Sequence, residues 1–157
     1  MKTQISKKQL IAAGFIDETE QAHVRALCEH LDCAPDDLSR ERFDNYGLAI
    51  YSLGKQEYAI GTDDEATNAA RKSIEDSAWA FNASFLSGFC DLPEVVFTAM
   101  QGGCEGANDA FVSLINKSGG MEKFADEAIS ADGRGHFLSG YDHEENECEG
   151  FYIYRAS

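Results

Sequence analysis

Five side chains that could take part in chemistry lie within one glycine-rich stretch of the sequence, and they are Asp132, Arg134, His136, Tyr141 and Asp142. A histidine titrates near neutral pH and can transfer a proton, while an arginine can hold a carboxylate or a phosphate. The stretch therefore contains a candidate catalytic or ligand-binding set, which we place at Asp132, Arg134 and His136.

The surrounding sequence does not strengthen this enzymatic interpretation. No nucleophile–base spacing accompanies the stretch, and the common phosphate-loop, dinucleotide, nucleophile-elbow and zinc-protease motifs are absent from the sequence. In the structural alternative, Arg134 pairs with an acidic neighbour and His136 bonds to the backbone. The sequence therefore favours a non-enzymatic protein over an enzyme and predicts no cofactor.

A dense run of carboxylates follows directly, and we call residues 142–149 the acidic segment. Its sequence, DHEENECE, contains Asp142, Glu144, Glu145, Glu147 and Glu149. Such a surface could dock on the basic groove of a partner that normally holds nucleic acid, mimicking the phosphates of DNA. The alternative is a solvated loop that only keeps the protein in solution. The run lacks the register of a calcium-binding EF-hand loop.

The net charge supports the same interpretation. The chain has 157 residues with 28 Asp and Glu against 13 Lys and Arg, for a formal charge of −15. The imbalance lies in the second half, and residues 73–116 contain no Lys or Arg. Direct binding to nucleic acid would have to overcome repulsion between like charges, so we expect a protein partner instead.

The five cysteines are an odd number at irregular spacings, which indicates reduced thiols in a chain long enough to fold without disulfides. Cys28, His30 and Cys33 could supply three zinc ligands. However, no second pair of ligands with zinc-binding spacing occurs. We therefore predict that the chain holds no metal ion.

The elements that must position these residues follow from hydrophobic periodicity and turn residues. We predict helices at 7–13, 19–31, about 35–43 and 62–89, a broken helix at 94–116, a helix at 121–129, and a loop through 132–142. A hairpin at about 46–61 turns at Gly54-Lys55, and the strand at about 150–155 pairs with it. The predicted fold is α+β, with a small antiparallel sheet packed against several helices. It forms a single domain over 1–157, with a helical front end at 1–44 and a sheet and helical body at 45–157.

Neither a secretory signal nor a membrane-spanning segment is expected, because no sufficiently long apolar run occurs. This predicts a cytoplasmic protein without a membrane partner. The predicted helix at 62–89 has a wide apolar stripe that includes Trp79, Phe85 and Phe89. Because the strong negative charge opposes self-association, we expect this helix at the centre of the fold and prefer a monomer slightly over a homodimer.

Three stretches, Trp79–Asn82, Ser130–Asp142 and Tyr152–Arg155, resemble small acidic accessory proteins encoded by phages and mobile elements. The resemblance covers about the last two thirds of the chain and assigns no catalytic residues. It implies a context rich in antagonists of host defence, including anti-CRISPR and antirestriction proteins. Together with the charge, it leads us to expect a DNA-mimicking inhibitor in the host cytoplasm. The alternatives are a small enzyme or ligand-binding domain and an acidic housekeeping interaction domain.

Overall fold

The computed structural model describes residues 4–157 and shows two compact units in the chain. Unit 1 combines the residues up to Ala69 with Arg134–Ser157, and unit 2 is the continuous segment Ala70–Gly133. These boundaries differ from the predicted division into residues 1–44 and 45–157. The single domain over 1–157 stays a prediction, and each unit is described by itself below.

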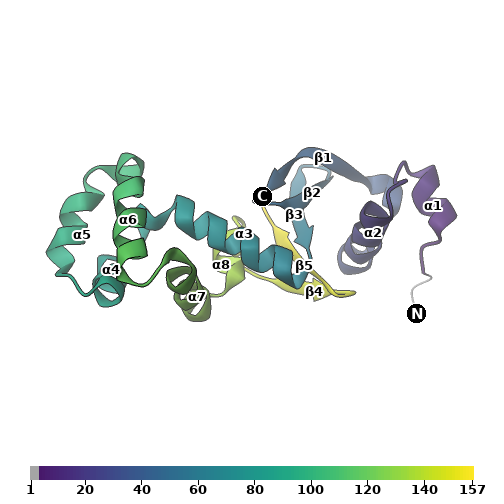
Figure 1. The fold of residues 1–157 in the computed structure, drawn as a ribbon. Helices are drawn as coiled ribbons and strands as arrows, with labels where there is room; N and C mark the ends of the chain where they lie inside the picture. Colours follow the sequence, from purple (N-terminus) through teal and green to yellow (C-terminus); the bar gives the residue numbers. More distant parts are fainter. Residues whose placement is uncertain (1–3) are drawn as a thin grey trace. The chain divides into compact units, whose positions relative to one another are not determined.

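Unit 1 is built on a five-stranded antiparallel sheet (Figure 1). The strand order is β1-β2-β3-β5-β4, and the strands are β1 (Leu38–Asn45), β2 (Leu48–Leu53), β3 (Gln56–Gly61), β4 (Asn146–Cys148) and β5 (Phe151–Arg155). The predicted hairpin corresponds to β2 and β3, and the predicted final strand is β5, which pairs with β3. The α+β fold class is confirmed, with edge strands β1 and β4 added to the predicted three.

Three two-residue turns connect neighbouring strands. Gly54-Lys55 joins β2 to β3 as predicted. Tyr46-Gly47 joins β1 to β2, and Glu149-Gly150 joins β4 to β5. Both residues of the last two turns have positive φ, the conformation that matches the twist of a hairpin. Tyr46 and Gly150 therefore lie in turns, not in the strands where the sequence placed them.

Both faces of the sheet are buried. On one face, Tyr51, Ile60 and Ile153 pack with residues of α2 (Glu18–Leu31) and α1 (Lys7–Ala12) in one core cluster. The two helices begin with the side-chain caps Ser6 and Asp17 and agree closely with the prediction. The residues that alternate with these three in β2, β3 and β5 face the other side, where α8 (Arg134–Leu138) contacts β5.

The helix predicted at about 35–43 is wrong. Pro35–Asp37 forms only a short 3-10 turn, and the chain then enters β1. Of the strand residues, only Leu38 is buried, so the alternation that marks a strand in sequence is nearly absent. Pairing with β2, rather than local pattern, determines this strand.

Unit 2 consists of short helices. The helix α3 (Asp63–Asp76) begins in unit 1 and its second half belongs to unit 2. It is followed by η2 (Ala78–Ala80), α4 (Ala83–Cys90), α5 (Glu94–Gln101), η3 (Cys104–Ala107), α6 (Asn108–Ser118) and α7 (Met121–Asp132). The continuous helix predicted at 62–89 is wrong, because Asn82 caps a new helix by accepting the backbone N–H of Ser84. The broken helix at 94–116 and the helix at 121–129 are confirmed as α5, α6 and α7.

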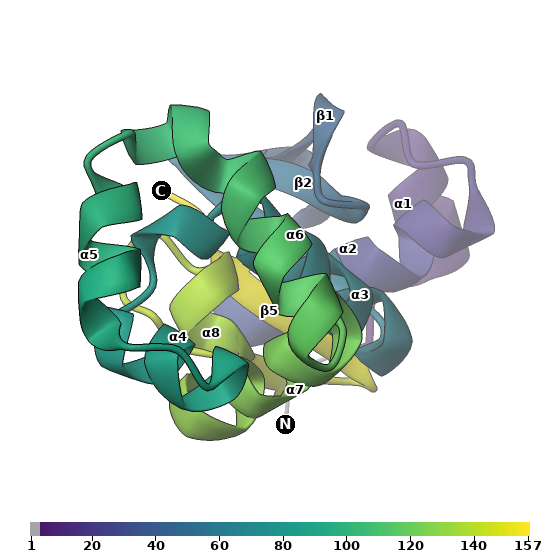
Figure 2. The same cartoon turned by 60° about the vertical axis from the view of Figure 1, so that its left-hand side comes forward.

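An aromatic cluster joins Phe124 of α7 to Phe85 and Phe89 of α4 and to Phe81, which precedes α4; Figure 2 shows both helices in unit 2. Phe124 of α7 is fully buried, and its ring centroid lies 5.0 Å from that of Phe81, 5.4 Å from Phe85 and 5.1 Å from Phe89. These rings therefore pack within the unit.

Within residues 4–157, no helix combines the length and the apolarity of a membrane span.

Candidate functional site

The acidic segment lies directly against α8. The sequence predicted a loop through 132–142, and α8 forms within that stretch instead. A Cβ atom on Gly135 would lie 2.6 Å from the carbonyl oxygen of His143 and 2.8 Å from the carbonyl carbon of Glu144. Contacts this short do not occur in proteins, so only glycine lets the two backbones approach. Gly135 thus allows the backbone of the acidic segment to pack directly on α8.

Arg134, at the start of α8, ties this segment to the rest of unit 1. Its Nε donates to Glu145 Oε1 at 2.7 Å, and Nη1 lies 2.7 Å from Asp63 Oδ1 and 3.0 Å from Thr67 Oγ1. The guanidinium also covers the ring of Tyr152, with Cζ 4.5 Å from the centroid. The side chain is only 11% exposed. Arg134 therefore pairs with an acidic neighbour, as the structural alternative to a catalytic role predicted.

Two neighbouring side chains, Arg134 and Tyr154, hold the carboxylate of Glu145 in place. Burial alone would lower the pKa of Arg134, but the hydrogen bonds to Glu145 and Asp63 raise it above its ordinary value, so the guanidinium stays charged. Tyr154 donates its hydroxyl to the same Oε1 atom of Glu145. Burial, and then this hydrogen bond, raise the pKa of Tyr154. Glu145 is therefore the residue that anchors the segment to Arg134 and Tyr154.

Asp142 organises the other end of the segment. Its Oδ1 accepts the backbone N–H of Glu144 at 3.0 Å and lies 2.8 Å from Oγ of the buried Ser139. The Glu144 N–H, and then the Ser139 hydroxyl, hold the pKa of this carboxyl below its usual range. Ser139 Oγ is also 2.8 Å from the carbonyl oxygen of Arg155. Asp142 is thus part of a turn that is fixed to β5.

The remaining carboxylates of the segment are exposed to solvent. Glu144, Glu147 and Glu149 are exposed, and none of them is in an ion pair within the described residues. Next to them, Tyr141 is 58% exposed and stacks on Arg155, whose Cζ lies 3.4 Å from the ring centroid. The segment therefore combines an anchored backbone with three outward carboxylates and an exposed aromatic ring.

The three candidate catalytic residues do not form a site in unit 1. Asp132 is the last residue of α7 and belongs to unit 2. His136 is exposed, with its ring 4.9 Å from that of Phe137 and 5.3 Å from that of His143. The guanidinium of Arg134 is held by groups of its own chain. These contacts do not favour acid–base chemistry or anion binding at this position.

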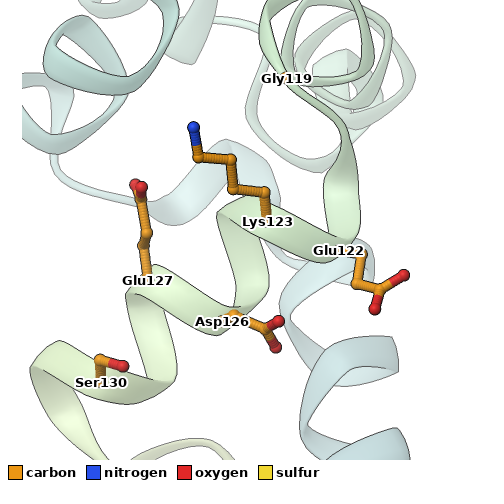
Figure 3. Close-up of a pocket in the computed structure, with 6 residues that line it drawn as sticks. All are labelled: Gly119, Glu122, Lys123, Asp126, Glu127 and Ser130. Atoms are coloured by element: carbon orange, nitrogen blue, oxygen red, sulfur yellow. The ribbon is translucent and has the colours of Figure 1, made fainter.

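A cavity of about 580 Å³ lies beside α7 in unit 2 (Figure 3). Lys123 and Glu127 project to one side of α7, and Glu122 and Asp126 project to the other. Arg71 already pairs with Asp126 at 2.9 Å and lies 3.6 Å from Glu122. The lining contains no aromatic or branched aliphatic side chain, unlike a typical small-molecule pocket.

The absence of a metal ion stays a prediction. Among residues 4–157, no three His, Cys, Asp or Glu side chains gather in a way that could hold a metal ion. Cys28 and Cys33 do lie together, with their sulfur atoms 3.8 Å apart, while His30 is exposed on α2.

Sequence reasoning did not single out several residues that support the acidic segment. They are Asp63, Gly135, Ser139 and Tyr154. Gly135 could have been noticed as a glycine between two side chains of chemical interest. Nothing local indicates Asp63, which is 71 residues away from Arg134 in sequence.

The chain matches no protein-family model, no curated protein and no solved structure. Its function is therefore inferred from the geometry of the acidic segment.

Proposed function

We propose that this chain is a non-enzymatic inhibitor of the phage type, in the manner of anti-CRISPR or antirestriction proteins. It acts in the host cytoplasm, where its acidic segment occupies the basic groove of a host defence protein that handles nucleic acid. The observation that carries the proposal is the anchored acidic segment. Arg134 and Gly135 fix its backbone, while Glu144, Glu147 and Glu149 stay exposed and form no ion pair with any residue from 4 to 157.

A docking surface differs from a solubilising loop in that its backbone is already ordered before the partner binds. A preorganised segment loses little conformational entropy when it binds, so its charges contribute more to affinity. The internal use of Asp142 and Glu145 also divides the five candidate residues by role. Glu144, Glu147 and Glu149 make the contact, and Asp142 and Glu145 maintain the shape. Tyr141 adds an aromatic anchor of the type found at binding hot spots.

The test is a charge-neutralising triple variant, E144Q/E147Q/E149Q, used as immobilised bait in a bacterial lysate. We expect a nucleic-acid-binding protein to be captured by the wild-type chain, released by duplex DNA, and bound about tenfold less by the variant. Capture should weaken as salt is raised, because exposed charges are screened.

The matched control removes three exposed carboxylates from unit 2, in the variant E75Q/E94Q/E105Q. It has the same net charge as the first variant and should capture the partner like the wild type. Equal loss in both variants would show that only overall charge matters. Unchanged capture by E144Q/E147Q/E149Q would remove the acidic segment from the mechanism.

The chain is expected to act as a monomer. Two of the three aromatic side chains that raised the question of self-association, Phe85 and Phe89, pack against Phe124 within unit 2. Light scattering should give a mass near 17.2 kDa. A stable mass of twice that value would contradict this part of the proposal.

A further inference from the structure

We propose that Cys28 and Cys33 form a dithiol site that closes reversibly to an intramolecular disulfide when it meets an oxidised low-molecular-weight thiol such as glutathione disulfide. Their sulfur atoms lie 3.8 Å apart and share a hydrogen bond. A disulfide needs about 2.05 Å, so the two sulfur atoms must still move closer before the bond forms. All five cysteines are reduced in the structure.

The end of α2 brings the two thiols together. Asp32 adopts the left-handed conformation, with φ 55° and ψ 52°, and so turns the chain back over the last helical turn. Cys33 then donates its backbone N–H to the carbonyl oxygen of Cys28 at 3.3 Å. This closed turn brings the two residues together, and the core cluster of unit 1, which includes Cys28, packs against Cys33.

An oxidant can reach the pair through a cavity of about 580 Å³ that both cysteines line, together with Arg25 and Glu149. Cys28 is buried and Cys33 is half-buried, so Cys33 is the thiol that meets the oxidant. Burial raises the pKa of Cys28 to about 12. Burial also raises the pKa of Cys33, while the hydrogen bond shared with Cys28 lowers it, which favours Cys33 over Cys28 as the thiolate.

The reaction is an ordinary thiol–disulfide exchange. The Cys33 thiolate attacks one sulfur of glutathione disulfide, a Cys33–glutathione bond forms, and the glutathione S–S bond breaks to release one glutathione. The Cys28 thiolate then attacks the Cys33 sulfur, the Cys28–Cys33 bond forms, and the second glutathione leaves. Each protein thiol gives up one proton and each released glutathione thiolate takes one up, so the protein is oxidised by the two electrons that glutathione disulfide gains.

The experiment treats the reduced, full-length protein with glutathione disulfide at pH 8.5 in the presence of a metal chelator, followed by alkylation and peptide mapping. We expect a mass loss of about 2 Da before alkylation, three alkylated cysteines instead of five, and one linkage that joins residues 28 and 33. A linkage to Cys148, which packs against the same core cluster, would overturn the assignment. So would full alkylation of all five thiols after treatment.

Two variants give an independent readout. In C28S, glutathione should stay bound to Cys33, and its loss should be at least about tenfold slower than in the wild type, because the resolving thiol is missing. In the matched control C148S, the disulfide should form at the wild-type rate. Glutathione loss at equal rates in C28S and wild type would refute the proposed order of attack.

Discussion

Replacing Arg134 with methionine tests whether this side chain is the internal support of the acidic segment. Hydrogen bonds to charged partners contribute about 1.5–3 kcal/mol each. However, Asp63 is 68% exposed and Glu145 is 32% exposed, so water replaces part of the loss. We expect R134M to lower the free energy of unfolding by about 2 kcal/mol, which corresponds to a fall of about 4–8 °C in the midpoint of thermal unfolding.

The matched control is R71M, which breaks a bidentate arginine–carboxylate contact with Asp126 in unit 2. Arg71 is 32% exposed, so its pair should contribute less than about 1 kcal/mol. Urea unfolding gives the free energies, and cleavage by a glutamate-specific protease reports on the order of the acidic segment. We expect faster cleavage after Glu144 and Glu147 in R134M only. Equal losses in the two variants with unchanged cleavage would refute the supporting role of Arg134.

Further predictions concern Gly135 beneath the acidic segment, the buried His23 and the aromatic cluster around Phe124. G135A should destabilise the protein by about 1–3 kcal/mol, because the added Cβ overlaps the backbone of the segment. Its circular dichroism should stay near that of wild type, and normal urea stability would contradict the close contact. Burial lowers the pKa of His23, so the unfolded state binds the proton more tightly and stability should fall as the pH drops below about 6.5. H23F should flatten this slope between pH 7.5 and 5.5 in urea titrations, whereas an unchanged slope would assign the effect to other groups. F124A should cost about 3–5 kcal/mol, because it empties the centre of three aromatic contacts. A loss below about 1 kcal/mol in urea unfolding would show that the cluster is not a core.

Elements with strong local patterns were predictable from sequence. The cap at Ser6 and the periodicity of residues 19–31 gave the first two helices, and Gly54-Lys55 gave the central hairpin. By contrast, β1 has charged residues on both faces and is specified by its pairing with β2. The break between α3 and α4 depends on Asn82, a capping residue that apolar periodicity alone obscures.

The residues of the candidate site could be predicted from the sequence, but the role of each residue could not. All five carboxylates of the acidic segment were identified, yet the sequence could not separate Glu145, which pairs with Arg134, from its neighbour Glu144. That distinction depends on Arg134 and on Asp63, which lies far away in sequence. Glycines around α8 indicated a flexible loop, whereas Gly135 permits close backbone contact.

The insertion of unit 2 into the sequence of unit 1 has a consequence for biosynthesis. The ribosome completes Ala70–Gly133 before it makes β5, the strand that lies between β3 and β4 in the sheet. Unit 2 can therefore fold cotranslationally from contiguous residues. During that time the edge of β3 that pairs with β5 stays unpaired. The acidic segment and its support at Arg134 also emerge only in this late stage. The surface proposed to bind the partner thus forms at the last step of vectorial folding, when unit 1 closes around its final strand.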